Sequence, residues 1–301
     1  MPTKDHIDAF GAVSLVGLAL LLAFNQVVIK VTNEAFQPVF FAGARSAGAV
    51  VCILLWMKWR RLRLILPRNV IPSALIIGLV FSAEFIMLFI ALDLTTVSRA
   101  SVIFYSMPLW MALGAHIFIP GDRLTPRKSL GLSLAFIGVA WAIIDRGDGG
   151  EASLLGDLCA LGAAIGWAAT GLLVKATPLK TVRPEVQLFY QVLISGVVLL
   201  AVAPLFGPLI RDPQPIHYVG LAFQIVVVVT FGFIFWLWLM SLYPASGVAS
   251  FSFLSPVLSV LLGWLLLDEH VGASILGALT LVAVGIVLIN RSPRAQVPQN
   301  V

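Results

Sequence analysis

Residues 10–31 read FGAVSLVGLALLLAFNQVVIKV, a run in which Lys30 is the one charged residue. At about 1.5 Å per residue, a helix of this length crosses the roughly 30 Å hydrocarbon core of a bilayer. No small-residue cleavage site follows the run, and another apolar run begins at residue 36. We therefore expect a retained membrane helix here rather than a cleaved secretory signal.

The rest of the chain has the same character. Of its 301 residues, 60% are hydrophobic and 11% are charged, and the mean hydropathy is +1.02. Soluble domains carry about 25% charged residues and disordered chains are poor in apolar ones, so both classes are excluded. Nine further apolar runs are long enough to span, at residues 36–57, 71–92, 97–119, 127–144, 152–173, 186–208, 216–243, 246–267 and 271–290. These runs do not alternate as barrel strands do, so we predict an all-α membrane protein with ten transmembrane helices.

The basic residues predict the orientation of these helices. If the N-terminus is cytoplasmic, 14 of the 19 Lys and Arg residues fall on the inner side, four fall outside, and Arg45 lies within a span. Positive residues concentrate on the cytoplasmic side of membrane proteins, so both termini are expected there. Topology and anionic lipid then explain the net charge of +5, and no nucleic-acid partner is expected.

Two halves of the chain share a set of ordered motifs. Pro108, in the sequence SMPL, lies 148 residues before Pro256, in the sequence LSPV. The stretch NQVVIK at 25–30 lies 145 residues before TGLLVK at 170–175. Similar offsets at several positions indicate an internal repeat.

Each half contains an odd number of spans, so the second half enters the membrane from the opposite side. We predict two inverted five-helix repeats at residues 8–145 and 152–291, with a cytoplasmic tail at 292–301. Inverted repeats are typical of transporters whose substrate site lies between the halves near the membrane midplane.

The ordered motifs resemble the drug/metabolite transporter superfamily, in its ten-helix form with two EamA-type repeats. The resemblance covers about residues 10 to 290 and rests on Asn25 to Lys30, Pro38 to Arg45, Pro108 with Asp122 and Gly131, and Pro256 with Glu269 and Gly277. One departure is Asp122, where the family usually has Glu.

Within this superfamily, the chain is most similar to bacterial exporters of aromatic and other neutral amino acids. The resemblance implies a bacterial inner-membrane carrier with a central cavity formed by helices 1–4 and 6–9, with helices 5 and 10 peripheral. It also implies alternating access of that cavity to the two sides of the membrane.

Arg45 and Glu84 are the charged residues deepest within the predicted spans. Arg45 lies nine residues below the outer end of its span and Glu84 lies eight, so both sit roughly 12–14 Å deep. Charges inside a bilayer are costly and are candidates for function. Two interpretations stay open: a buried ion pair that joins two helices, or contact with the substrate, with Glu84 as a possible carrier of a coupling proton.

Neutral polar residues interrupt several other spans. Gln187, Tyr190 and Gln191 share one helix face by their i, i+3, i+4 spacing, and they either line a cavity or join helices. Amides and hydroxyls beside aromatic residues suit a zwitterion with an apolar side chain, whereas a phosphate would need clustered Lys or Arg. The remaining candidates for the substrate cavity are Asn25, Ser101, Tyr105, Trp167, Thr170, Gln224 and Ser252.

Three further features bear on the mechanism. Pro108 and Pro256 are predicted to kink their helices, as static bends or as gating points, because proline removes a backbone hydrogen bond. Trp236, near the end of its span, is interpreted as an anchor at the lipid headgroups. The small residues at 42–49 predict close helix packing within a monomer rather than a dimer interface.

Other function classes lack their motifs. The sequence contains no Gly-x-x-x-x-Gly-Lys-Ser/Thr loop, which would indicate an ATP-driven pump. It also contains no catalytic dyad or Cys/His cluster, which would indicate an intramembrane enzyme, so no metal or cofactor is expected. The sequence predicts a secondary transporter that exports small neutral metabolites, with aromatic and other neutral amino acids as the favoured substrates. The alternatives are a carrier of drugs or other metabolites and, less favoured, a channel.

Overall fold

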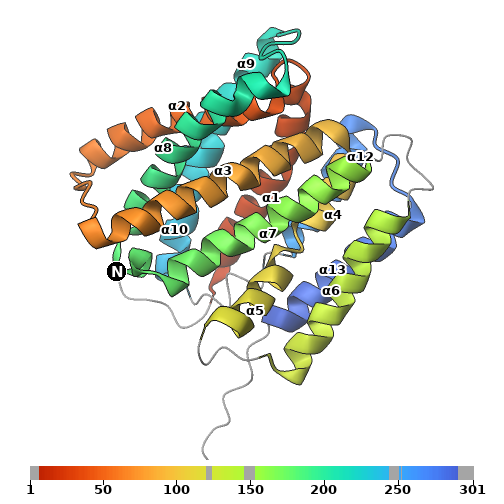
Figure 1. Cartoon of the computed structure of the whole chain (residues 1–301). Coiled ribbons are helices and arrows are strands. Elements are labelled where there is room, and N and C mark those ends of the chain that lie inside the picture. Colours follow the sequence, from red (N-terminus) through yellow and green to blue (C-terminus); the bar gives the residue numbers. More distant parts are fainter. Residues whose placement is uncertain (1–6, 120–123, 146–152, 244–250, 252, 291–301) are drawn as a thin grey trace, which may run out of the picture.

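A computed structural model describes residues 7–119, 124–145, 153–243, 251 and 253–290. All regular elements in these residues are helices, apart from one isolated bridge between Phe36 and Ile210 (Figure 1). The helices of the first half are α1 (Ala9–Asn33), α2 (Pro38–Trp59), η1 (Arg68–Val70), α3 (Ile71–Leu94), α4 (Val97–Phe104), α5 (Met107–Phe118) and α6 (Pro126–Ile144). Those of the second half are α7 (Leu154–Ala176), η2 (Pro178–Thr181), α8 (Pro184–Val202), η3 (Ala203–Phe206), α9 (Pro215–Phe223), η4 (Gln224–Gly232), α10 (Phe233–Leu242), α12 (Leu254–Leu267) and α13 (Ala273–Asn290).

Within the described residues, nine helical stretches are long and apolar enough to cross a bilayer. The remaining apolar helix, α12, has 14 residues, and most of residues 246–253, with which the predicted ninth span begins, lie outside the described part. The protein is therefore an all-helical membrane protein, and the count of ten spans stays a prediction.

Two predicted spans are interrupted for identifiable reasons. The span at 97–119 breaks between α4 and α5, because Pro108 lacks a backbone N–H and its ring crowds the preceding turn. The span at 216–243 contains the π-helical segment η4, in which Thr230 donates its hydroxyl hydrogen to the Ile225 carbonyl at 2.8 Å. Segments of this kind occur frequently at functional sites.

The two halves pack on each other through several pairs of helices. In Figure 1, α3 and α7 lie side by side at the centre, with α8 against both α2 and α3. Helix α1 packs on α12, α7 packs on α4 and α5, and α6 pairs with α13 at one edge. The core is thus built from contacts between sequence-distant helices of opposite halves.

Small residues set the closest approaches between these helices. A Cβ atom added at Gly43 would meet Leu200, and one at Gly166 would meet Glu84 of α3. The stripe of small residues at 42–49 therefore packs on helices of the same chain, as the monomer interpretation expects.

Gly285 provides a test of the α6–α13 pair. A Cβ atom at Gly285 would lie 2.6 Å from the Gly131 carbonyl oxygen, and backbone cannot move aside as a side chain can. We expect Gly285→Val to lower the free energy of unfolding by about 1–3 kcal/mol through overpacking, measured as a lower melting temperature in detergent. Gly17→Val is the matched control, because nothing lies within 4 Å of a Cβ there. Equal melting temperatures for the two variants would show that the contact does not hold the helices together.

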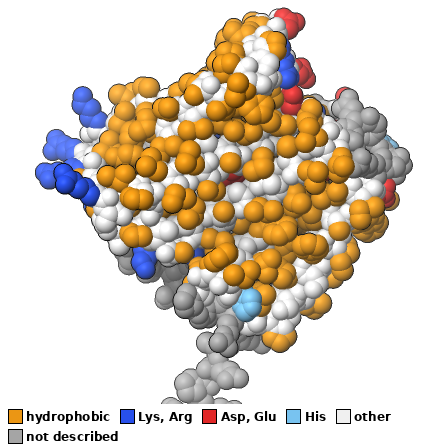
Figure 2. Space-filling model, in the orientation of Figure 1, with side chains coloured by type: hydrophobic (Ala, Val, Ile, Leu, Met, Phe, Trp, Pro, Cys, Tyr) orange, Lys and Arg blue, Asp and Glu red, His pale blue; other side chains and the backbone are white. Residues whose placement is uncertain are grey.

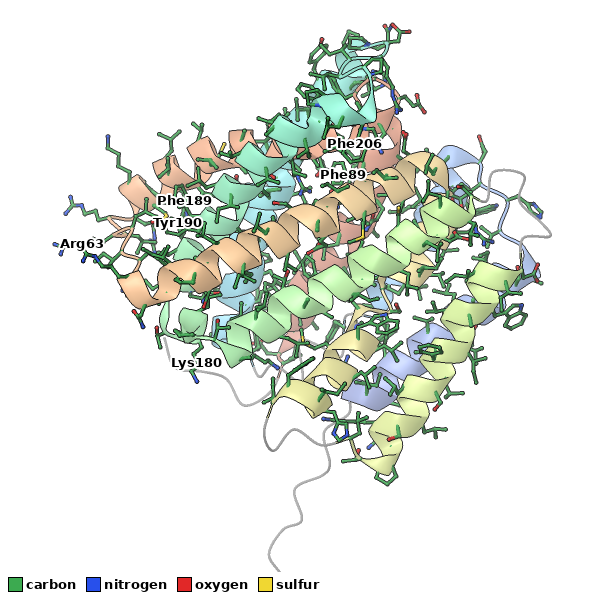
Figure 3. All side chains as sticks on the ribbon, in the orientation of Figure 1. Arg63, Phe89, Lys180, Phe189, Tyr190 and Phe206 are labelled. Carbon is green, nitrogen blue, oxygen red and sulfur yellow. The ribbon has the colours of Figure 1, made fainter. Side chains whose placement is uncertain are left out.

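The surface divides into a broad apolar band and two charged ends. Figure 2 shows hydrophobic side chains over most of the visible face, with Lys and Arg gathered at the left and Asp and Glu at the upper right. Arg63 and Lys180, labelled in Figure 3, both lie at the left, which we name the basic end. Exposed helical residues such as Val13 and Leu55 are apolar, as a lipid-facing surface requires.

Candidate substrate cavity

A cavity of about 390 Å³ lies among α1, α5, α7, α10 and α12. Its size is within the range of pockets that bind small molecules, and its walls are largely apolar, as such pockets are. The aromatic side chains that line it are those of Tyr105, Trp167, Phe233, Trp236 and Phe251. A cavity of this kind accepts an apolar or aromatic group.

The cavity runs from the middle of the bundle to its basic end. Lys175 and Asn290, in the last turns of α7 and α13, line one end of the cavity, and Lys175 is exposed. Tyr105 and Ser255, next to the break between α4 and α5 and in α12, line the deeper part. The basic end therefore carries the mouth of the cavity.

The opposite end is closed by a buried ion pair. Arg99 near the start of α4 donates from Nη2 to Asp157 Oδ2 at 2.7 Å, and Asp157 near the start of α7 is fully buried. The same guanidinium donates to the carbonyls of Ala142 at 2.5 Å and Asp145 at 3.0 Å, at the end of α6. One side chain thus joins α4, α6 and α7 at the end that lies away from the mouth.

Glu269 makes a second closure at that end. Its carboxylate follows α12 and accepts from the backbone N–H groups of Val97 at 2.5 Å and Ser98 at 2.9 Å. The Ser98 hydroxyl donates to the same carboxylate at 2.6 Å. These are the unsatisfied donors of the first turn of α4, where a negative charge is favourable. A residue of the second half thereby caps a helix of the first.

A third group of contacts joins α1 and α3 to the loop before α9. Asn33 Nδ2 donates to the Phe89 carbonyl at 2.9 Å, and Lys30 Nζ donates to the Thr95 carbonyl at 3.0 Å. Arg211 donates from Nη1 to Asp93 Oδ1 at 2.8 Å, and this hydrogen bond raises the pKa of the Arg211 guanidinium. Polar contacts from six helices or their ends and from the loop before α9 hold this end of the bundle together.

Arg45 does not form the ion pair that was one of its two interpretations. Its Nη1 donates to Gln224 Oε1 at 3.5 Å, and its guanidinium lies over the rings of Phe85 at 4.0 Å and Phe89 at 4.9 Å. Gln224, in the π-helical segment, donates in turn to Asn25 Oδ1 at 2.5 Å. Asn25, Arg45 and Gln224 are therefore brought together as one buried polar group from α1, α2 and η4.

Glu84 is fully buried on α3, against Gly166 of α7. Neither of its carboxyl oxygens has a hydrogen-bond partner among the described residues, and no nitrogen of Arg45 lies within 4.0 Å. Arg45 and Glu84 therefore make no contact ion pair, and the Arg45 guanidinium lies against Gln224 and the phenylalanine rings instead.

Glu84→Gln distinguishes these arrangements. Because no hydrogen bond or contact ion pair is lost, we expect the melting temperature to stay within about 2 °C of the parent protein, the scale of one kcal/mol or less. Arg45→Gln is the comparison variant. Because it removes a hydrogen-bonded guanidinium, it should lower the melting temperature clearly. A fall of similar size for Glu84→Gln would show that the carboxylate is paired with Arg45 after all.

The remaining predicted residues lie in different surroundings. Tyr105, Pro108 and Trp167 line the cavity, whereas Gln187 donates to the carbonyls of Leu179 and Val182, both at 2.8 Å. Buried or half-buried positions that do not line it are those of Asn25, Arg45, Glu84, Ser101, Thr170, Tyr190, Gln191, Gln224 and Pro256. Ser252 lies outside the described residues.

Several lining residues have no signal in the sequence. Trp236, interpreted as a headgroup anchor, lines the cavity, and so do Phe233 and Met111 from uniformly apolar runs. Only the rotation of each helix about its axis decides which apolar side chain faces inwards.

Comparison with known proteins places this arrangement in a family. The model of the EamA-like transporter family matches residues 9–144 and again 154–291. The chain belongs to the EamA-like transporter family. The resemblance seen in the sequence is thus confirmed.

Relatives of this EamA-like protein extend over nearly its whole length. The uncharacterised transporter YvbV of Bacillus subtilis is 29% identical over 292 residues, covering 92% of this chain and 93% of the relative. A protein of Escherichia coli named as a probable amino-acid metabolite efflux pump is 29% identical over 296 residues, covering 92% of each. A solved crystal structure, 22% identical, shares the fold with a TM-score of 0.66 over 91% of this chain and 94% of that one. The family and the apolar helices make this a multi-pass membrane transporter, and the relatives' names denote transporters rather than enzymes.

Proposed function

We propose that the protein is a secondary transporter that exports small neutral metabolites, with aromatic and other neutral amino acids as its substrates. The observation that carries the proposal is a cavity of about 390 Å³, lined by aromatic side chains and reaching the basic end, beneath a closed polar end. A site that reaches one side and is closed from the other is what alternating access requires.

The same features support the orientation. The basic end, with Arg63 and Lys180, is the cytoplasmic end if the positive-inside rule holds, so the cavity faces the cytoplasm (Figure 3). In this proposal the chain forms ten helices in two inverted repeats at 8–145 and 152–291. Both termini, with the tail at 292–301, are cytoplasmic, and the protein is a monomer in a bacterial inner membrane. The bacterial relatives support the last assignment.

The substrate class follows from the walls of the cavity and from one relative. The aromatic residues in the cavity walls favour a substrate with an apolar or aromatic side chain, and Lys175 at the mouth attracts the carboxylate of that substrate. The Escherichia coli relative is named as a probable amino-acid metabolite efflux pump. A carrier of drugs or other metabolites is the second candidate, because apolar walls accept many such molecules. A channel is disfavoured, since the Arg99–Asp157 and Glu269 contacts close one end.

Uptake into liposomes tests the proposal. Purified protein is reconstituted, and uptake of labelled tryptophan, phenylalanine, threonine and methionine is measured with and without a pH gradient. Saturable uptake of any of these amino acids is the expected result, and its response to the gradient shows whether protons are coupled. Folded protein that takes up none of them would overturn the amino-acid assignment and leave the drug or metabolite carrier.

A further inference from the structure

Three buried polar atoms without partners lie one helical turn beyond the deep part of the cavity. They are Gln26 Oε1 on α1, Ser101 Oγ on α4 and Ser259 Oγ on α12. Each residue is at most 2% exposed. Buried polar groups are nearly always hydrogen-bonded, so three unpartnered ones on neighbouring helices need an explanation.

Helix periodicity places all three on faces that line the cavity. On α1, Ala19 and Leu22 line it, and Gln26 continues the same face by one turn. Tyr105 lines it four residues after Ser101, and Ser255 lines it four residues before Ser259. In each case the step leads away from the basic end, so the three residues lie on the same helix faces, one turn beyond the residues that line the cavity.

The three helices also touch one another, which brings these residues together. Contacts join α1 to α12, α12 to α4, and α1 to α4. The Tyr105 hydroxyl interacts with the side chains of Gln26, Ser255 and Ser259, and Tyr105 also lines the cavity, so this residue links the cavity to the polar cluster. The other unpartnered side-chain atoms belong to Asn33 on α1, Arg45 and Ser46 on α2, Glu84 on α3 and Thr170 on α7.

We infer that Gln26, Ser101 and Ser259 form the polar subsite of the cavity and that it binds a primary ammonium group of the substrate. An amide oxygen and two hydroxyl oxygens are acceptors, and an ammonium group carries three N–H donors. The apolar part of the substrate then lies against Trp167 and Phe233, nearer the mouth. This inference rests on the proposed function and names the group that the site selects.

Binding of three related probes to the full-length protein tests the inference. Phenylalanine has both charged groups, 2-phenylethylamine lacks the carboxylate, and 3-phenylpropionate lacks the amine. Because Trp167 and Trp236 line the cavity, tryptophan fluorescence reports binding. We expect phenylalanine and 2-phenylethylamine both to bind, and 3-phenylpropionate to bind at least about tenfold more weakly than phenylalanine, the scale of a hydrogen bond to a charged group.

Variants assign the effect to the subsite. Gln26→Met and Ser259→Ala should each weaken 2-phenylethylamine binding by about tenfold. Gln26→Glu adds a negative charge and should strengthen the binding of 2-phenylethylamine. This variant keeps the test decisive if Gln26→Met does not fold. Ser195→Ala is the control, because Ser195 is equally buried but donates to the Val192 carbonyl of its own helix at 3.2 Å. It should change none of the constants.

The contrary outcomes separate the inference from the proposed function. Equal binding of phenylalanine and 3-phenylpropionate would overturn the ammonium subsite while the carrier function stands. Variants that shift only the melting temperature would show that the cluster holds a buried water and would overturn the subsite as well. Binding of none of the probes would overturn both the subsite and the amino-acid assignment.

Discussion

Replacing Ala19 with tryptophan is expected to abolish transport while leaving the fold intact. Ala19 lines the cavity in the middle of α1, where an indole would take up much of the space of about 390 Å³. Because the new ring enters an existing cavity, the protein should be as stable as its parent or more so, by up to about 2 kcal/mol. Uptake into liposomes, compared with protein-free vesicles, measures the first effect, and the melting temperature measures the second.

Val16→Trp is the matched control for this experiment. Val16 lies on the same helix but is 43% exposed on the apolar surface, so an indole there meets lipid. Transport by this variant should equal that of the parent protein. If Ala19→Trp also transported at the parental rate, the cavity would not lie on the substrate's path.

Removing Arg99 is expected to destabilise the protein strongly. Arg99→Leu leaves Asp157 fully buried without its counter-ion, which costs about 3–5 kcal/mol. The two carbonyls of Ala142 and Asp145 also lose their donor. The melting temperature should fall by about 6 °C or more.

Two further variants test whether the buried charge is the cause. Arg99→Leu combined with Asp157→Leu removes both charges and should recover most of the loss, because an apolar pair can replace a buried ion pair. Asp93→Asn breaks the partly exposed pair with Arg211 at the same end and should cost at most about 1 kcal/mol. A double variant as unstable as Arg99→Leu alone would show that the hydrogen bonds to the α6 carbonyls, and not the charge, hold this end closed.

Much of the architecture could be predicted from the sequence, because it depends on interactions between residues that are close together in the chain. The length of each apolar run predicts a helix that satisfies its own backbone in lipid. Pro108 predicts the break between α4 and α5, and the paired motifs predict the two family matches at 9–144 and 154–291. These features depend on residues close together in the chain and need no knowledge of packing.

The partners of the buried polar residues were decided only by the tertiary structure. The sequence places Arg45 and Glu84 at one depth, but Arg45 bonds Gln224, which is 179 residues away, and Glu84 packs against Gly166. Trp236 likewise lines the cavity although its position in the sequence predicts an anchor. In a membrane, lipid and protein interior are both apolar, so hydrophobicity fixes how deep a residue lies but not which way its helix turns. That rotation is set by side-chain packing between distant segments, and it selects the residues that face the cavity.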